Sequence, residues 1–464
     1  MPVLSSVTAT STAVLATQDE LPGWSLPGLE RQDTHLRRIV KYASTVYPVF
    51  PALAELSDGR RRPSIPTQDV VHALFFGMLL RTRSLNALEG KLMQSGFQRL
   101  LGRRATPETK TFSADTVARV LDSLQTQGLR LLLARIAREA ERKKLFRSGP
   151  EGAKRVVALD GWEMFCSESR HCNECLTREK TKNGSQVLEY YHRAVVALLV
   201  HDDLDLVLDF EALRCADLRR RSGIVTESHE GEQTAALRLI RRLHQTFGNW
   251  LDLFVLDALY PNGPLLTALD DLGFGAVITV KKETDEPFKD AIALTVGKPP
   301  DLCWDDETRK EHARAWDVDE LQTLDTYRGK LRVVQVKVEK NGAARNWSAV
   351  VVGKRARKLP AFVVHRIHRS RWRLEDNGFN HWVQHWNATH VFRHTPNAIE
   401  AILLLLVLAF NLTGVFVHRR LRWPRSPKDP CRTLLAVVSR LVDEIAALVR
   451  PVRWALLMLE TTAR

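Results

Sequence analysis

The stretch "KRVVALDG" at residues 154–161 decides the fold class. Four apolar residues, 156–159, run directly into Asp160 and Gly161. A short apolar run bounded by polar residues is typical of a buried strand, whereas aspartate is a poor strand residue and is costly to bury without a partner. We therefore expect a buried strand that ends at Asp160, with a partner for the carboxylate close by.

Strands and helices alternate after this first strand. The dipeptide Asn183-Gly184 suits a tight hairpin turn, and Ser228 is the expected N-cap of the first helix. A second apolar strand, "WLDLFVLD" at 250–257, also ends in an aspartate, Asp257. The pattern predicts an α/β fold with a mixed five-stranded sheet. The expected strands lie near 154–161, 187–200, 204–214, 250–257 and 274–282, and the expected helices at 228–247 and 263–272.

Segments of other kinds flank this pattern. Residues 32–150 have helical apolar spacing, with Ser64 and Ser113 as the expected N-caps. Residues 282–360 contain β-like runs separated by Asn341-Gly342, which indicates a β-rich insertion. Further helices are expected at 365–386, 398–420 and 431–459.

Composition narrows the class of protein. The 464 residues carry a formal net charge of +14, which favours an anionic partner, nucleic acid before an acidic membrane. Six cysteines are too few for a disulfide framework, so we expect a reducing cytosol. Residues 1–28 lack the features of a signal peptide and are expected to be a poorly ordered lead. The apolar run 401–417 is interrupted by Asn411 and Gly414, which favours a central buried helix over a membrane span.

The two aspartates call for a common explanation. Asp160 and Asp257 are both expected at the ends of buried strands, which could bring them close together. Two carboxylates in one apolar site repel each other, and one would be forced to stay protonated. A magnesium ion prefers hard oxygen ligands and removes this conflict. The alternative for either aspartate alone is a turn or cap residue after a strand, but the pair favours a magnesium site.

Helical spacing indicates a third carboxylate. One face of the helix expected at 365–386 carries five residues spaced three, four, three and four: Trp372, Glu375, Phe379, Trp382 and Trp386. This aromatic face should point into the core, and Glu375 is its one charged member. A metal held by the two aspartates would give Glu375 a partner. The alternative partner is Arg371, four residues earlier on the same helix.

The three carboxylates resemble the catalytic Asp-Asp-Glu set of DDE-type insertion-sequence transposases, which have an RNase H-like fold. The resemblance covers about 150–415. It is carried by "VVALDG", by "VLDALYPNGPLL" and above all by "RWRLEDNGFNHWVQHW" followed by "HTPNAIEAILLLLVLAFNL". It implies that Asp160, Asp257 and Glu375 are catalytic ligands of Mg²⁺ or Mn²⁺ and that Arg371 is a further catalytic residue.

Two positions depart from the pattern of many relatives. His368 stands where those relatives have a tyrosine, and Trp382 stands where they have a lysine. The residues typical of hairpin-type cleavage in those relatives are therefore only partly matched here, which leaves open the route of cleavage.

By the same resemblance, the chain is a transposase that binds the inverted-repeat ends of an insertion sequence and catalyses metal-dependent DNA cleavage and strand transfer. Its partners would be terminal-repeat DNA, target DNA and a second copy of the chain, with no membrane, at the nucleoid of a bacterial cytoplasm. The implied organisation is a disordered lead at 1–28, a helical DNA-binding domain at 29–150, an RNase H-like catalytic core at 151–281 and 361–420, a β-rich insertion at 282–360 and a C-terminal helical segment at 421–464.

A separate cluster of thiols and imidazoles lies in "CSESRHCNECLTR" at 166–178. A Cys-x-x-Cys turn across a hairpin can hold zinc with two further ligands, and similar residues occur in the relatives at this place. The alternative is a pair of reduced cysteines near a turn. The candidate ligands of one structural zinc ion are Cys166, His171, Cys172, Cys175 and His192.

Basic residues gather in two places. Between 353 and 373 there are eight Lys or Arg and no acid, which favours phosphate contacts beside the carboxylates over a solvated basic face. The candidate DNA-binding residues are Lys354, Arg355, Arg357, Lys358, Arg366, Arg369 and Arg373. Between 58 and 104 there are nine Lys or Arg against three Asp or Glu, which favours DNA contact by the N-terminal helices.

Two other functions fit the same residues. One is an RNase H-like nuclease that cleaves DNA without joining it. The other is a catalytically dead DNA-binding derivative of a transposase. The presence of all three acidic residues argues against the second alternative.

Overall fold

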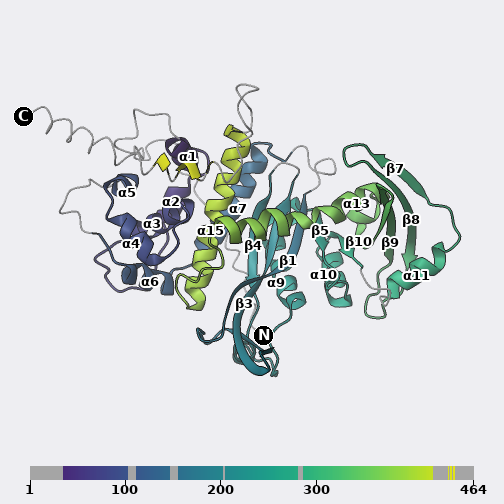
Figure 1. Cartoon of the computed structure of the whole chain (residues 1–464), viewed down its shortest axis with the longest axis horizontal. Helices are drawn as coiled ribbons and strands as arrows, with labels where there is room; N and C mark the ends of the chain where they lie inside the picture. Colours follow the sequence, from purple (N-terminus) through teal and green to yellow (C-terminus); the bar gives the residue numbers. More distant parts are fainter. Residues whose placement is uncertain are drawn as a thin grey trace, which may run out of the picture.

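The computed structural model describes residues 35–102, 111–146, 155–201, 204–280 and 286–421, together with 437, 439–441 and 443–444. The lead expected at 1–28 lies outside the described residues, as does most of the helical segment expected at 421–464. The described part is elongated, with the N-terminal helices at one end and the strands β7–β9 at the other (Figure 1).

The N-terminal part is helical, as the apolar spacing predicts. Ser113 caps a helix as expected, because its side chain accepts a hydrogen bond from the backbone N–H of Thr116. The expectation for Ser64 is wrong, since that helix begins after Pro66, whose ring already fixes a compatible φ. The helices are α1 (His35–Thr45), α2 (Val49–Ala54), α3 (Thr67–Leu79), α4 (Leu85–Leu92), α5 (Ser95–Leu100), α6 (Ala114–Ser123) and α7 (Gln127–Arg142).

A large mixed sheet follows the N-terminal helices. Its strands are β1 (Val156–Ser167), β2 (Leu176–Lys182), β3 (Ser185–Val200), β4 (Leu206–Ala212), β5 (Leu253–Leu256), β6 (Gly275–Thr279), β7 (Leu302–Asp306), β8 (Glu311–Leu321), β9 (Leu331–Lys340) and β10 (Ala343–Val352). Strands β1, β5 and β6 are parallel neighbours, whereas β3 is antiparallel to β1 and β4 is antiparallel to β3. The mixed α/β architecture is therefore confirmed.

The sheet is larger than the five strands predicted. Among the described residues it has ten strands, in the order β2-β3-β1-β5-β6-β10-β9-β8-β7, with β4 also paired to β3. The strands of the β-rich segment join the sheet because β10 pairs with β6 in antiparallel fashion. The sequence pattern identifies these strands but carries no signal for which existing edge they extend.

Two hairpins have the turns that the sequence predicts. Asn183 and Gly184, with φ of 52° and 81°, join β2 to β3. Asn341 and Gly342, with φ of 49° and 78°, join β9 to β10. Positive φ at both central residues is the requirement of a type I′ turn. The first hairpin, with the outer half of β1, forms a projection that we call the β1–β3 arm, residues 163–192 (Figure 1).

Helices lie against the sheet and link its strands. The prediction that Ser228 is the N-cap of α9 is wrong, since the helix starts after Gly231. Glu230, expected in the first turn of the helix, lies before it and forms a buried ion pair with Arg238. The remaining helices are α8 (Ala216–Arg221), α9 (Glu232–Phe247), η1 (Gly248–Trp250), α10 (Gly263–Asp271), α11 (Glu286–Thr295), α12 (Lys354–Arg357), α13 (Ala361–Ser370), η2 (Leu374–Asn380), α14 (His381–His385), α15 (Pro396–Phe416) and η3 (Val417–Leu421).

The apolar helix α15 is the centre of the core, as expected from its sequence. It packs against α3, α6 and α7 and against β4 (Figure 1). The helical stretch Pro396–Leu421 is long and apolar enough to cross a membrane, yet 83% of its most apolar window is buried inside the protein. The polar residue Asn411 is tolerated in this buried helix because its side chain is bonded to the backbone of Val207 in β4. Its amide accepts a bond from the backbone N–H of Val207 at 3.0 Å and donates one to the carbonyl at 2.7 Å.

Candidate active site

The register of two parallel strands brings Asp160 and Asp257 side by side. Leu159 of β1 is paired with Leu256 of β5, so the next residue along each strand is one of the aspartates. The strand β1 does not end at Asp160 as predicted but continues to Ser167, because β3 remains paired with it and Asp160 lies opposite Val196. It is β5 that ends here. The two carboxylates therefore meet where one strand stops and its neighbour runs on.

An aromatic contact brings the third carboxylate to the same place. Trp162 lies two positions after Asp160 and so shares its face of β1. Its ring stacks on Phe379 with a centroid separation of 5.9 Å and meets Trp382 edge-on at 5.4 Å. Phe379 belongs to η2, which also carries Glu375. The packing of Trp162 therefore holds the helix of Glu375 against the strand of Asp160.

The guanidinium of Arg371 lies among the three carboxylates. Its Nη1 atom is 2.7 Å from Oδ2 of Asp160 and 2.9 Å from Oε1 of Glu375. Its Nη2 atom is 4.0 Å from Oδ1 of Asp257. The arginine side chain is 4% exposed, and its cationic group partly neutralises a site with three acids. The four residues predicted as catalytic thus lie together in the folded chain.

Burial and charge both act on Asp160. The pKa of this carboxyl is raised to about 6, chiefly by burial, with a smaller contribution from the carboxylates of Asp257 and Glu375. Arg371 opposes the shift. A buried acid with this environment is ionised at neutral pH at a cost, which a cation can remove.

Glu232 is a fourth acid at the edge of the site, which sequence reasoning missed. It is the first residue of α9 and forms an ion pair with Arg193 of β3. Its carboxylate also lies 3.4 Å from the hydroxyl of Tyr260. A Cβ atom at Gly161 would overlap this carboxylate, so a larger residue after Asp160 would displace the Glu232 side chain from its contact with Arg193.

The helix that carries Glu375 differs from the continuous α-helix predicted. The α-helix α13 ends at Ser370, and η2 has π-helical hydrogen bonding, which is frequent at functional sites. The predicted common face is therefore only partly correct. Trp382 and Trp386 are buried at 0% and 2% exposure, whereas Trp372 is 44% exposed.

A residue outside the predicted set fixes this helix. Asp205, in the segment between β3 and β4, accepts two hydrogen bonds of 2.9 Å from Arg373. It accepts another of 2.7 Å from the side-chain amide of Asn377. The clamp joins η2 to the β3–β4 connection.

The two departures from the relatives' pattern are core residues. His368 is 4% exposed, and its Nε2 atom lies 3.0 Å from the hydroxyl of Thr279. Trp382 lies beneath Trp162. Both side chains pack inside the protein.

The basic residues of the segment 353–373 have different surroundings in the folded protein. Arg355 donates to the carbonyl of Leu251, and Arg357 forms ion pairs with Asp319 and Glu320. Lys354 and Lys358, on the same part of the chain, are exposed. A second group lines a hollow of about 470 Å³ beside the Glu375 helix, together with Trp347 and Trp372. Its arginines are Arg309, Arg345, Arg366, Arg369 and Arg373.

Part of the Cys/His set forms a compact cluster at the base of the β1–β3 arm. Cys172, Cys175 and His192 gather there, and they are joined by His394 from the loop before α15. Sequence reasoning missed His394, because it lies more than 200 positions from the cysteines with no local spacing to indicate it.

Two members of the predicted set lie outside that cluster. Cys166 is exposed on β1, and His171 stacks on Tyr190. Their side chains are not among the four whose ligand atoms come together.

Comparisons with known proteins agree with the resemblance seen in the sequence. Residues 221–412 match the family described as "Transposase DDE domain". This segment contains Asp257, Arg371 and Glu375, while Asp160 lies before it. The resemblance to DDE-type transposases is thereby confirmed.

A solved structure was also found to be similar, a piggyBac transposase synaptic complex with hairpin DNA. The sequence identity is 10%, the TM-score is 0.41, and the match covers 91% of this chain and 82% of that one. No curated protein matches the chain.

Proposed function

We propose that this chain is a transposase that binds the inverted-repeat ends of an insertion sequence and cleaves and joins DNA strands there with a divalent metal. One observation carries the proposal: three carboxylates from three separate elements converge on Arg371. Asp257 and Glu375 belong to the segment that matches the transposase family. Asp160 is linked to them by its contact with Arg371 and by strand register.

The donor set fits magnesium or manganese. The ligand atoms are carboxylate oxygens, which hard divalent cations prefer. The site already attracts a cation, since the guanidinium of Arg371 contacts two of the carboxylates within hydrogen-bonding distance. Divalent ions held by Asp160, Asp257 and Glu375 would activate an attacking oxygen and stabilise the leaving oxygen of a phosphodiester.

The protein residues supply position and charge. Asp160 and Asp257 are fixed by strand register, while Glu375 is fixed through Trp162 and the Asp205 clamp. Arg371 offers a cationic donor for phosphate oxygens as well as for the carboxylates. In phosphoryl transfer, positioning and charge neutralisation provide most of the rate acceleration.

The arginine-lined hollow is the proposed DNA contact beside the site. Arg366, Arg369 and Arg373, from the predicted set, share it with Arg309 and Arg345. Guanidinium groups suit phosphate oxygens, and tryptophan faces suit exposed bases. Arg369 and Arg373 also form ion pairs, with Glu311 and Asp205, so these two hold the fold as well as lining the hollow. Arg355 and Arg357 are bonded to other parts of the protein and do not line the hollow, which argues for a structural role.

The proposal includes an RNase H-like core built from β4, β3, β1, β5 and β6. It also includes DNA binding by the N-terminal helices, a homodimer on paired ends, and action at the nucleoid in a bacterial cytoplasm. The convergence of Asp160, Asp257 and Glu375 on Arg371 favours an active enzyme over a dead derivative.

The test uses the full chain and a labelled duplex that carries the DNA flanking the gene. We expect nicking that frees 3′-hydroxyls at the repeat ends in Mg²⁺ or Mn²⁺, followed by joining to a target plasmid. Cleavage that persists in excess EDTA would contradict the metal assignment. Cleavage without joining would favour the nuclease, and binding without cleavage would favour the dead derivative.

A further inference from the structure

The Cys/His cluster has the dimensions of a metal site. Sγ of Cys172 lies 3.7 Å from Sγ of Cys175, and each sulfur is 3.3 Å from Nε2 of His192. Sγ of Cys175 is also 3.4 Å from Nε2 of His394. All four ligand atoms lie within 4.8 Å of one another.

These separations can be compared with those of a tetrahedral zinc site. With Zn–S near 2.3 Å and Zn–N near 2.0–2.1 Å, tetrahedral angles place neighbouring ligand atoms about 3.3–3.8 Å apart. The four separations given above, from 3.3 to 3.7 Å, fall in that range. Two thiolates with two imidazoles are a common donor set of structural zinc.

We propose that Cys172, Cys175, His192 and His394 bind one zinc ion, and that this ion fastens the β1–β3 arm to the loop at 387–395 that precedes α15. The cysteines lie in the connection between β1 and β2, and His192 lies on β3. Only His394 comes from the distant loop. The zinc therefore cross-links the β1–β3 arm to the loop at 387–395. The link depends on His394, because the other three ligands all belong to the arm.

The loop also holds the N-terminal helices. Arg393, next to His394, donates two hydrogen bonds to the carboxylate of Asp122 in α6, at 3.0 and 2.8 Å. On the other side of His394, the hydroxyl of Thr395 bonds to the same carboxylate at 2.7 Å. The zinc therefore adds a link between the β1–β3 arm and α6 through this short loop, beside the packing of α7 and α15 on β4.

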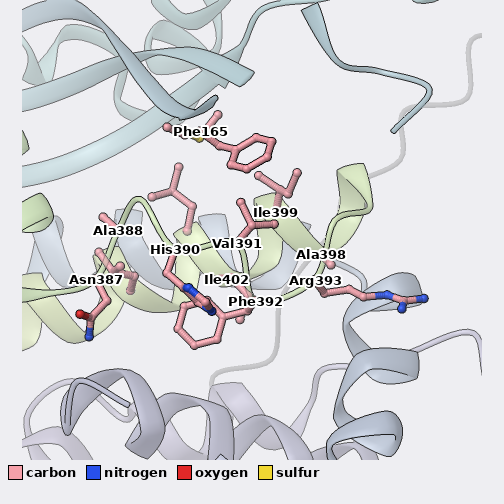
Figure 2. A pocket seen from close by; sticks show the side chains of 13 residues that line it. Phe165, Asn387, Ala388, His390, Val391, Phe392, Arg393, Ala398, Ile399 and Ile402 are labelled. Atoms are coloured by element: carbon pink, nitrogen blue, oxygen red, sulfur yellow. The ribbon is translucent and has the colours of Figure 1, made fainter. Parts of the chain in front are cut away.

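The side chains between the β1–β3 arm and the loop at 387–395 are not closely packed. A cavity of about 30 Å³ lies between the outer part of β1, the loop and α15. Figure 2 shows Phe165 on one side of it and Val391 and Ile399 facing it, while Arg393 points away. Atoms that line a void lose dispersion contacts. The directional bonds of a metal supply a fixed distance where side-chain packing does not.

The zinc site is independent of the proposed function, because its residues do not overlap the carboxylate site. The competing explanation for the paired cysteines is a redox dithiol that closes into a disulfide. That explanation gives His394 no role. The two are separated by metal content and by the oxidation state of Cys172 and Cys175.

The experiment uses the untagged full chain, expressed without added zinc and purified without chelator. We expect one zinc ion per chain by elemental analysis, and cobalt substitution should give the visible absorption of a tetrahedral thiolate site. His394→Ala should lose the zinc, while His394→Cys, which restores a fourth ligand, should retain it. His390→Ala is the matched control in the same loop and should keep the full content, as should Cys166→Ser and His171→Ala.

A second measurement tests the cross-link itself. Removal of zinc from the wild type, or His394→Ala, should increase amide hydrogen exchange in 387–395 and in α6, while exchange in β8 and β9 stays unchanged. Zinc content near zero in folded wild-type protein, a Cys172–Cys175 disulfide in place of metal, or full zinc content in His394→Ala would each overturn the proposal.

Discussion

Arg371 and Asp160 lie 211 positions apart in the sequence, and their side chains meet at 2.7 Å. The same guanidinium contacts Glu375, so the local salt bridge that competes with a metal as an explanation for Glu375 does exist. It does not exclude the metal, because a third acid approaches the same arginine. A surface pair would not draw in two carboxylates from a buried sheet.

Two adjacent acids on η2 should behave differently. Glu375 contacts Arg371, whereas Asp376 is exposed and faces the arginine-lined hollow. Glu375→Gln should keep DNA binding and lower strand cleavage by more than about 100-fold, since even supporting partners of metal ligands are worth 10- to 100-fold. Asp376→Asn is the matched control and should cost far less. Equal activity of the two variants in the labelled-duplex cleavage assay would show that Glu375 is not a ligand.

The raised pKa of Asp160 predicts how stability depends on pH. The folded-state pKa, about 6, lies above the ordinary value of 3.8, so the metal-free protein is most stable with this group protonated. This stabilisation is complete below pH 4 and is lost as the pH rises through 6. Asp160→Asn removes the titration and should stabilise the EDTA-treated protein at pH 7.5 by roughly 1–3 kcal/mol.

Thermal unfolding in EDTA and in Mg²⁺ measures that difference. The wild-type melting temperature should rise with Mg²⁺ at pH 7.5, and that of Asp160→Asn should not. An advantage of Asp160→Asn that is the same at pH 4 and pH 7.5 would contradict the assigned cause.

The contact between Gly161 and Glu232 predicts a double-mutant coupling. Gly161→Ala places a Cβ atom against the Glu232 carboxylate, which is held by Arg193. We expect a loss of about 1–3 kcal/mol in unfolding free energy, typical of overpacking. In the background of Glu232→Ala, the same change should cost much less. Additive losses in urea denaturation would show that the two residues do not oppose each other.

The arginine-lined hollow predicts an unequal effect of arginine substitutions on DNA binding. Arg345→Ala and Arg366→Ala should each weaken binding to a short duplex and reduce the slope of log K against log salt by about one. Arg355→Ala should leave both quantities unchanged, because that side chain is bonded to Leu251 and Asp252. Fluorescence anisotropy over a salt series gives both values. Equal changes in DNA affinity and in salt dependence for the three variants would mean that the hollow is not a preferred site of phosphate contact.

Asn411 offers a test of the core. Asn411→Leu fits the apolar composition of α15 but leaves the N–H and C=O groups of Val207 without these partners. We expect a loss of about 1–3 kcal/mol or more, the cost of unsatisfied buried polar groups. Thr413→Val is the matched control and should cost less, because that hydroxyl bonds only to the carbonyl of Ala409 in its own helix. The comparison uses urea unfolding monitored by circular dichroism.

Local patterns predicted a good part of this molecule. The turns at Asn183 and Asn341 need positive φ at two residues. Each turn has the sequence Asn-Gly, which is the pair that most readily adopts positive φ, so the sequence predicts both turns. The burial of α15 follows from its apolar sequence. The three carboxylates were found because an acid in an apolar context is costly and so has to be explained.

The rest depends on contacts that local patterns do not encode. Whether β1 ends at Asp160 is decided by the length of β3, its partner. Trp372 is exposed although Trp382 is buried, because the π-helical residues of η2 lie between them. The longer helical period of η2 changes the rotation of Trp382 relative to Trp372 from that expected of an α-helix. His394 joins the cysteines through the path of the chain after α14, and only the fold brings them together.

The position of α15 also governs when this protein can fold during its synthesis. The helices α3, α6 and α7 are complete once residue 142 has been made, but the helix they surround spans Pro396–Phe416. At roughly 5–20 residues per second, a ribosome needs about 15–55 s to make the intervening chain. For that interval the faces of α3, α6 and α7 that pack on α15 lack this partner. The packing of these helices is therefore completed only after α15 has been made, and a chain that stops before residue 396 lacks the helix against which α3, α6 and α7 pack.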